Sequence, residues 1–222
     1  MMTRSREQGD IIPAFDPGHW LPVVDALVAD GHAVLPGFFS TDACTALRAE
    51  LQALDAAGAL QPAAIGRGEL RQQRSDIRGD RMTWLQPEWC AGGDYLACLD
   101  GLRRVLNEQL FLALAEVEAH YACYPPGAGY RRHVDRHQAG AAGRPGQGER
   151  VISTVTYLNE PGWPADGGGE LVLHSPSAGE VVVPPEGGTL VVFRSDDLPH
   201  EVRQSRRLRY SIAGWMRTRA LS

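Results

Sequence analysis

The stretch EVVVPPEGGTLVVFR, residues 180–194, decides the fold class of this chain. Two runs of β-branched and aromatic residues, 180–183 and 189–194, flank a turn rich in Pro and Gly, as consecutive antiparallel strands do. The same pattern recurs through the second half of the chain, at Val117 to Tyr124, Arg150 to Asn159, Gly169 to His174, Glu180 to Val183, Thr189 to Arg194 and Leu208 to Met216. Six such runs with few helical stretches between them predict an antiparallel sandwich or barrel, and a jelly roll is the simplest form.

Helices are expected before this β-rich half. Apolar residues recur at helical spacing from Pro17 to Asp30 and from Asp94 to Leu110, and Ser40 is placed to cap a further helix. Short strands are expected at Ala33 to Phe39 and around Met82 to Leu85. The predicted fold is therefore α+β and mainly β: a double-stranded β-helix, or cupin-like jelly roll, supported by N-terminal helices.

The chain is expected to form one domain behind a short leader. Residues 1–12 are mostly polar and are interpreted as flexible, and residues 13–222 are long enough for one substantial core. Within that domain the helical support is expected over about 13–115 and the jelly-roll core over about 116–217.

Charge and cysteine content restrict the partners and the compartment. Twenty-seven acidic against 22 basic residues give a formal net charge of −5, which disfavours nucleic acid and anionic membranes as partners. Four scattered cysteines fit neither a disulfide framework nor a zinc knuckle, so reduced thiols are expected. No apolar run approaches the ~20 residues of a membrane helix, and the start has no secretion pattern. We therefore expect a cytoplasmic protein with no nucleic-acid or membrane partner.

A candidate metal site begins at His133-Val134-Asp135. In an extended strand, residues two apart project from the same face, so both side chains can bind one ion. His200 follows Pro199, and the chain can bring it back to the same ion as a third ligand. Two histidines and one carboxylate leave coordination positions open, as in non-haem Fe(II) oxygenases. On spacing alone, coincidence explains the pattern equally well, because the chain has seven histidines and 27 acidic residues.

Arg209 is a candidate anion-binding residue. The stretch RLRYSIAGW, residues 207–215, alternates so that Arg209, Ser211, Ala213 and Trp215 share one face of a strand. A guanidinium pointing into a barrel requires a carboxylate, and a dicarboxylate cosubstrate could supply it. The alternative is a solvated basic strand, because other arginines stand nearby.

At these residues the sequence resembles the 2-oxoglutarate and Fe(II)-dependent oxygenases, and within them prolyl 4-hydroxylases of the hypoxia-inducible-factor type and their bacterial relatives. The resemblance covers roughly residues 77–216. It is carried by Ala122-Cys123-Tyr124-Pro125, by the run from Gly129 to Asp135, by Tyr157-Leu158-Asn159 and by DIRGDRMTW, residues 76–84. The Ala-, Gly- and Arg-rich composition is compatible with a bacterial source.

The resemblance implies roles for particular residues. It implies that iron is held by His133, Asp135 and His200. It further implies that Arg209 and Tyr157 bind the distal carboxylate of 2-oxoglutarate, that Tyr124 lines the cosubstrate pocket and that Leu171 forms its apolar wall. It also implies that the substrate side of the site contains Arg78, Asp80 and Trp215. Asp80 is expected to pair with Arg150 and so to tie the base of a loop to the core.

The resemblance also implies an activity. Fe(II), 2-oxoglutarate and O2 would serve to hydroxylate a prolyl residue of a protein to 4-hydroxyproline, releasing succinate and CO2, with ascorbate as a candidate reductant. Elongation factor Tu is the first candidate substrate. The alternatives are an oxygenase of the same fold acting on a small molecule or a free amino acid, a nucleic-acid demethylase, and a non-catalytic metal-binding module that recognises a peptide.

Overall fold

A computed structural model of the chain describes residue 12 and residues 16–63, 78–135 and 148–219. The helical elements are η1 (Pro17–Trp20), α1 (Leu21–Asp30), α2 (Thr41–Ala56) and α3 (Cys90–Leu110). The strands are β1 (His32–Leu35), β2 (Gln61–Pro62), β3 (Arg81–Trp84), β4 (Leu114–Tyr124), β5 (Tyr130–His133), β6 (Arg150–Tyr157), β7 (Leu171–Ser175), β8 (Gly179–Val183), β9 (Leu190–Arg194), β10 (His200–Val202) and β11 (Arg209–Thr218). The predicted jelly-roll class is confirmed.

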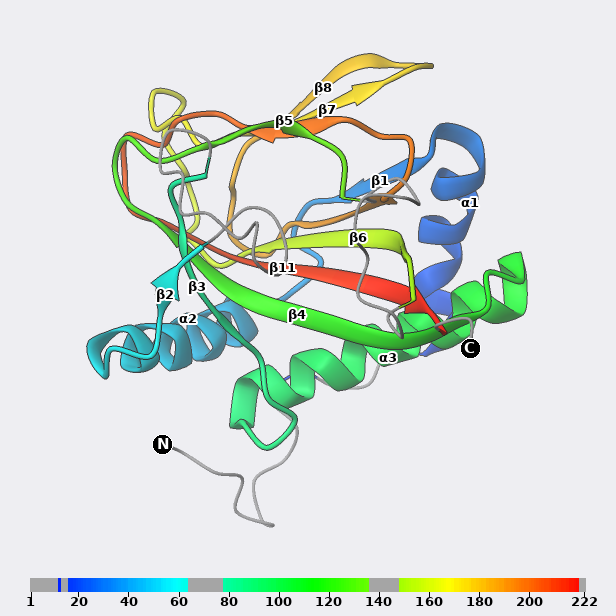
Figure 1. Ribbon diagram of the computed structural model, residues 1–222, viewed down its shortest axis with the longest axis horizontal. Coiled ribbons are helices and arrows are strands. Elements are labelled where there is room, and N and C mark those ends of the chain that lie inside the picture. Colours follow the sequence, from blue (N-terminus) through cyan, green and yellow to red (C-terminus); the bar gives the residue numbers. More distant parts are fainter. Residues whose placement is uncertain (1–11, 13–15, 64–77, 136–147, 220–222) are drawn as a thin grey trace.

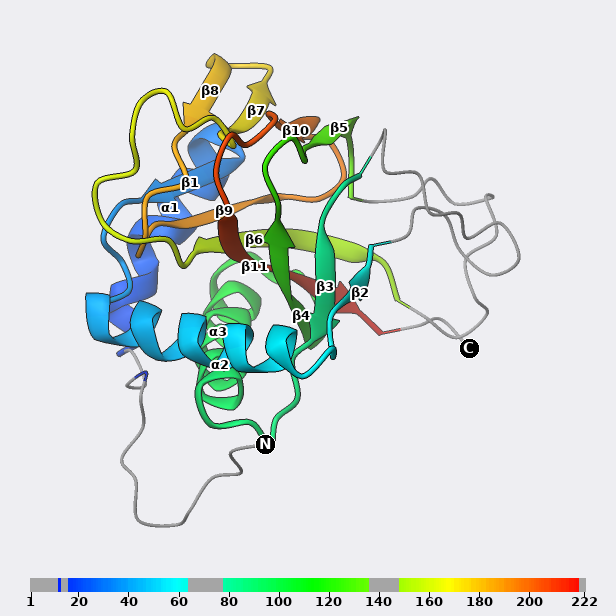
Figure 2. The same ribbon diagram turned by 90° about the vertical axis from the view of Figure 1, so that its left-hand side faces the viewer.

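Two antiparallel sheets form the body of the domain. The large sheet has the order β1-β9-β6-β11-β4-β3-β2, and the small sheet has the order β5-β10-β7-β8. Figure 1 shows the small sheet above the large one and helices α2 and α3 beneath it. The turned view in Figure 2 shows the same layers, with α2 and α3 stacked on the side of the large sheet that faces away from β5 and β10. The helices therefore close one face of the large sheet and leave its other face to the small sheet.

The hydrophobic residues divide into two main clusters that follow these layers. The larger cluster joins the helices to the outer face of the large sheet, through residues such as Leu47, Leu99 and Ile212. The second lies between the sheets and contains Tyr157 and Leu171. Ile12, which was expected in the flexible leader, is buried in the first cluster with 3% exposure. The other residues of that leader lie outside the described part of the chain.

Helix boundaries follow the capping groups. Ser40 accepts a hydrogen bond from the Ala43 amide at 3.2 Å, which confirms its predicted role as the N-cap of α2. Helix α3 begins four residues before the predicted Asp94, because the Glu50 carboxylate of α2 accepts bonds from the amides of Ala91 (3.0 Å) and Gly92 (2.9 Å). A capping group from another helix leaves no signal in the local sequence.

The short strands differ most from expectation. Strand β1 ends at Leu35 instead of Phe39, because the chain turns at Gly37, whose φ is +65°. The six predicted runs all contain strands, but they omit β5 and β10, which have four and three residues. These two strands pair with each other and carry two of the candidate metal ligands. No helix in the described residues is both long and apolar enough to span a membrane.

Candidate active site

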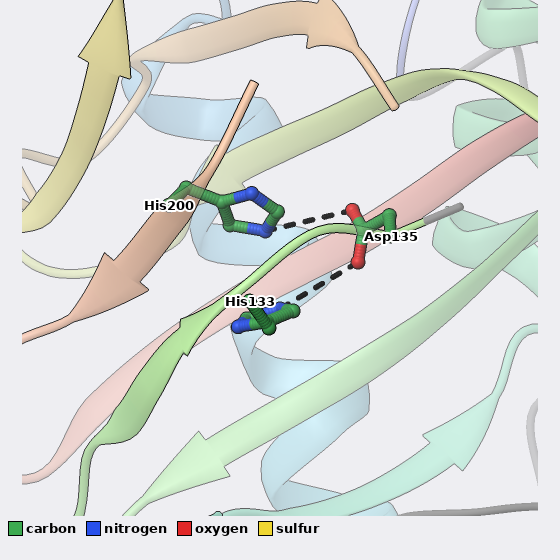
Figure 3. A group of neighbouring side chains, drawn as sticks. All are labelled: His133, Asp135 and His200. Carbon is green, nitrogen blue, oxygen red and sulfur yellow. Dashed lines mark ion pairs between the residues drawn. The ribbon is translucent and has the colours of Figure 1, made fainter. Parts of the chain in front are cut away.

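Three predicted ligands meet where the two sheets face each other. His133 ends β5, Asp135 follows it by two residues, and His200 opens β10, where it pairs in register with His133. Oδ1 of Asp135 lies 3.6 Å from Nε2 of His133, and Oδ2 lies 3.6 Å from Nε2 of His200. Figure 3 shows both rings beside the carboxylate, each joined by a dashed line to a different oxygen of Asp135. Among the described residues this is the one group of three such side chains that could hold a metal ion.

The other nitrogen of each ring is fixed by the backbone. Nδ1 of His133 lies 2.7 Å from the carbonyl oxygen of Arg131, and Nδ1 of His200 lies 3.1 Å from that of Leu198. A carbonyl only accepts, so each neutral ring carries its proton on Nδ1 and leaves the Nε2 lone pair facing Asp135. Two oriented imidazoles and a carboxylate form the donor set of a non-haem Fe(II) site. The residues therefore fit a divalent iron ion.

Burial and charge act in opposite directions on these ligands. Burial disfavours the ionised form of Asp135, but the facing His200 and His133 outweigh it and hold the pKa of the carboxyl well below its usual range. Burial lowers the pKa of His200, against the opposing effect of Asp135. The lowered pKa of His200 favours the neutral imidazole, which is the form that binds a metal.

Arg209 is the second feature of the site and is 1% exposed. Its Nε donates to the Gly169 carbonyl at 2.9 Å and its Nη1 to Ser211 Oγ at 3.1 Å. No carboxylate among the described residues forms an ion pair with it, although a buried cation normally has one. These two hydrogen bonds use only part of the guanidinium, so it can still donate to an anion, as the alternation of residues 207–215 predicts. The solvated-strand alternative is excluded by this burial.

Two tyrosines enclose the guanidinium. The rings of Tyr124 and Tyr157 lie 4.8 and 5.0 Å from its central carbon. The Tyr157 hydroxyl is buried and has no hydrogen-bond partner among the described residues, and burial raises its pKa to about 12. Leu171 packs in the same apolar cluster as Tyr157. An unpartnered buried hydroxyl beside an unpaired cation fits the distal carboxylate of 2-oxoglutarate.

The predicted pairing of Asp80 with Arg150 is wrong. Asp80, which is 2% exposed, takes a two-pronged ion pair from Arg78 at 2.7 and 2.9 Å. Arg150 instead bonds Glu118 at 2.8 Å and covers the Trp215 ring at 3.6 Å. The strand register explains this outcome, because β4 places Glu118 opposite Trp215 in β11, and β11 on its other edge pairs Arg217 with Arg150 at the start of β6. Sequence spacing does not reveal such a neighbour.

An aromatic group lies beside Trp215 and was missed from the sequence. His120 lies 5.4 Å from Trp215 and 5.3 Å from Trp84, between ring centroids. Burial and then the charge of Arg78 lower the pKa of His120 to about 4, so the ring is neutral. The alternation from Tyr124 back through Ala122 to His120 could have placed it on the site face. These rings continue the site along the inner face of the large sheet.

Tyr130 was also missed. Its ring stacks on His133 with centroids 3.6 Å apart, and the Arg78 guanidinium lies 4.9 Å from the Tyr130 ring. His174 has a side chain only 12% exposed, between Glu180 and Glu201.

This jelly roll brings together two histidines and a carboxylate, and it buries an arginine that has no carboxylate partner among the described residues, which is the pattern expected of a non-haem Fe(II) oxygenase. Residues 119–217 match the sequence profile of the 2OG-Fe(II) oxygenase superfamily. Egl nine homolog 1 of Homo sapiens is 30% identical over 206 residues, which cover 87% of this chain and 45% of the relative. The chain spans about half the length of the curated relatives that it matches first.

Two solved structures are similar over most of their length. A prolyl-4-hydroxylase of Pseudomonas putida is 41% identical with a TM-score of 0.78, covering 89% of this chain and 98% of that one. A prolyl hydroxylase of Trichoplax adhaerens, solved with a hypoxia-inducible-factor peptide fragment, is 28% identical with a TM-score of 0.77, covering 90% of each chain. The chain belongs to the 2OG-Fe(II) oxygenase superfamily and is of the prolyl hydroxylase type. Members of this family require Fe(II), 2-oxoglutarate and O2.

Proposed function

We propose that this protein is a 2-oxoglutarate- and Fe(II)-dependent dioxygenase that hydroxylates a prolyl residue of a protein to 4-hydroxyproline. One observation carries the proposal: the His133, Asp135 and His200 cluster shares the inner face of the sheets with a buried arginine that has no carboxylate partner among the described residues. The cluster accounts for the iron, and Arg209 accounts for a cosubstrate with a second carboxylate.

The residues take separate roles. Iron is held by His133, Asp135 and His200. Bound iron, with 2-oxoglutarate and O2, supplies the oxidising equivalent for hydroxylating a C–H bond and yields succinate and CO2. Arg209 and Tyr157 hold the distal carboxylate, Tyr124 covers the guanidinium, and Leu171 closes the pocket with an apolar wall. Because these groups are almost fully buried, they exclude water from the cosubstrate.

The substrate side is formed by Trp215, its aromatic neighbours, and the Arg78–Asp80 pair. Trp84 in this group is 42% exposed, so part of the aromatic surface is open to a partner. An apolar ring such as proline packs well on aromatic faces. The prolyl hydroxylases among the similar proteins support a prolyl substrate, and the Trichoplax enzyme was solved with a peptide. We propose elongation factor Tu as the first candidate, which places the enzyme in the cytoplasm.

Intact mass measurement tests this function. Purified elongation factor Tu is incubated with the enzyme, Fe(II) and 2-oxoglutarate, with ascorbate added as reductant, and succinate is measured in parallel. We expect elongation factor Tu to gain the mass of one oxygen atom at a proline, and Asp135→Ala to abolish both signals. Succinate without a modified protein would be turnover uncoupled from hydroxylation, with ascorbate as the reductant, and would refute elongation factor Tu as the substrate. Metal binding without any succinate would point to a non-catalytic peptide-binding module.

A further inference from the structure

Two buried serines stand behind the carboxylate of Asp135. Ser153 Oγ lies 2.7 Å from Oδ2 of Asp135 and 2.7 Å from Ser195 Oγ. Ser153 is 1% exposed and Ser195 is fully buried. Both distances are at the short end for bonds between hydroxyl and oxygen, so the three side chains form a continuous hydrogen-bonded chain. Neither serine was singled out from the sequence.

The direction of this chain follows from its chemistry. A carboxylate that binds a metal is ionised and can only accept hydrogen bonds. Ser153 therefore donates its single hydroxyl proton to Oδ2. It has no second proton for Ser195, so the Ser195 hydroxyl must donate to Ser153. Each hydroxyl is thereby held in one orientation.

The chain also joins the two sheets at the metal site. Ser153 lies in β6 and Ser195 directly follows β9, and the Ser195 amide donates to the Val151 carbonyl at 2.9 Å. Asp135 belongs to the other side of the site, two residues beyond the end of β5, and lies outside any strand. The backbone of Asp135 is therefore not fixed by hydrogen bonds between paired strands, whereas both serines are held by the large sheet.

We propose that Ser195 and Ser153 form a positioning relay that fixes the rotamer of Asp135 and commits Oδ2 to a hydrogen bond. Oδ1, which faces Nε2 of His133 at 3.6 Å and accepts no bond from either serine, is then the oxygen presented to the metal. The inference rests on the proposed function, in which Asp135 is an iron ligand. It assigns the two serines a role in metal affinity that is distinct from packing.

Titration with Mn(II) tests the relay without turnover. Electron paramagnetic resonance measures free Mn(II) for the wild type, Ser153→Ala, Ser195→Ala and the double variant. Loss of a group that orients a metal ligand typically weakens binding about 10- to 100-fold, and we expect this for Ser153→Ala. Ser195→Ala acts only through Ser153, so its smaller effect should vanish in the Ser153→Ala background. Ser153→Thr keeps the hydroxyl and should bind Mn(II) within about three-fold of the wild type.

Thr154→Val provides the matched control. Thr154 is the next residue of β6, is 1% exposed, and faces the helical side of the sheet. Its variant should bind Mn(II) as the wild type does. Ser153→Ala binding within two-fold of the wild type, or lower thermal stability of the metal-free protein with unchanged Mn(II) affinity, would overturn the relay. If Ser153→Ala does not fold, Ser195→Ala must still weaken Mn(II) binding. A wild type that binds no Mn(II) would instead refute the proposed iron site.

Discussion

Replacing Arg209 by Met should remove the recognition of the second carboxylate of 2-oxoglutarate. A charge-assisted bond contributes about 1.5 to 3 kcal/mol, and 1.4 kcal/mol corresponds to a tenfold change in affinity. The dissociation constant of 2-oxoglutarate should therefore rise about 10- to 150-fold. The metal-free protein should change little in thermal stability. The variant loses the bonds to Gly169 and Ser211, but it also loses a buried charge that has no carboxylate partner among the described residues.

Calorimetry on the Mn(II)-loaded protein, which does not turn over, measures this effect. 2-Oxobutyrate lacks the distal carboxylate. Comparing the two acids on the wild type and on Arg209→Met therefore gives a double-mutant-type cycle of four binding constants. The wild type should discriminate between the two acids by the same 10- to 150-fold, whereas Arg209→Met should bind both about equally. Arg203→Ala is the control. The Arg203 side chain lies between β10 and β11 and is 48% exposed, so this variant should leave both dissociation constants unchanged. Undiminished discrimination in Arg209→Met would refute the assignment of the anion site.

Three further outcomes are expected. The pKa of His120 is about 4 in the folded protein against an ordinary 6.5, so the unfolded state binds more protons between these pH values. The free energy of unfolding should fall by roughly 3 kcal/mol as pH drops from 6.5 to 4, and denaturant titrations of His120→Phe should lose that dependence. Asp135→Ala should abolish both Mn(II) binding and succinate formation, and residual turnover would contradict its role as a ligand. Trp84→Ala should raise the KM for the protein substrate about three- to tenfold, because aromatic contacts are lost, while the KM for 2-oxoglutarate stays unchanged. An equal rise in both KM values would contradict a place for Trp84 on the substrate side.

The candidate site residues could be singled out from the sequence because their chemistry is visible in residue type and spacing. His133 and Asp135 stand two apart, although the strand expected to carry both ends at His133, and Arg209 stands in an alternating strand. The burial of Arg209 and the meeting of His133 with His200 agree with those expectations. The lengths of β5 and β10 could not be predicted, because three or four residues are too few to show a period.

Neighbours across strands could not be predicted in the same way. Arg150 meets Glu118 and not Asp80 because of the register between three strands. The start of α3 depends on a carboxylate from another helix. Each of these contacts joins residues that are distant along the chain. A single sequence contains no local trace of them.

The two sheets contribute different residues to the site, which explains why contacts between strands matter for it. The histidines are carried by β5 and β10, short strands of the small sheet, and Asp135 stands outside any strand. Both strands are short, and their register shifts between His200 and Val202. The large sheet is closed by helices on its outer face, and it supplies Ser153 against Asp135 as well as the buried Arg209. The two histidines therefore come from the small sheet, while the serine behind Asp135 and the buried arginine come from the large sheet. Substitutions on the inner face of β6 and β11 should accordingly alter metal and cosubstrate affinity even where they touch neither ligand directly.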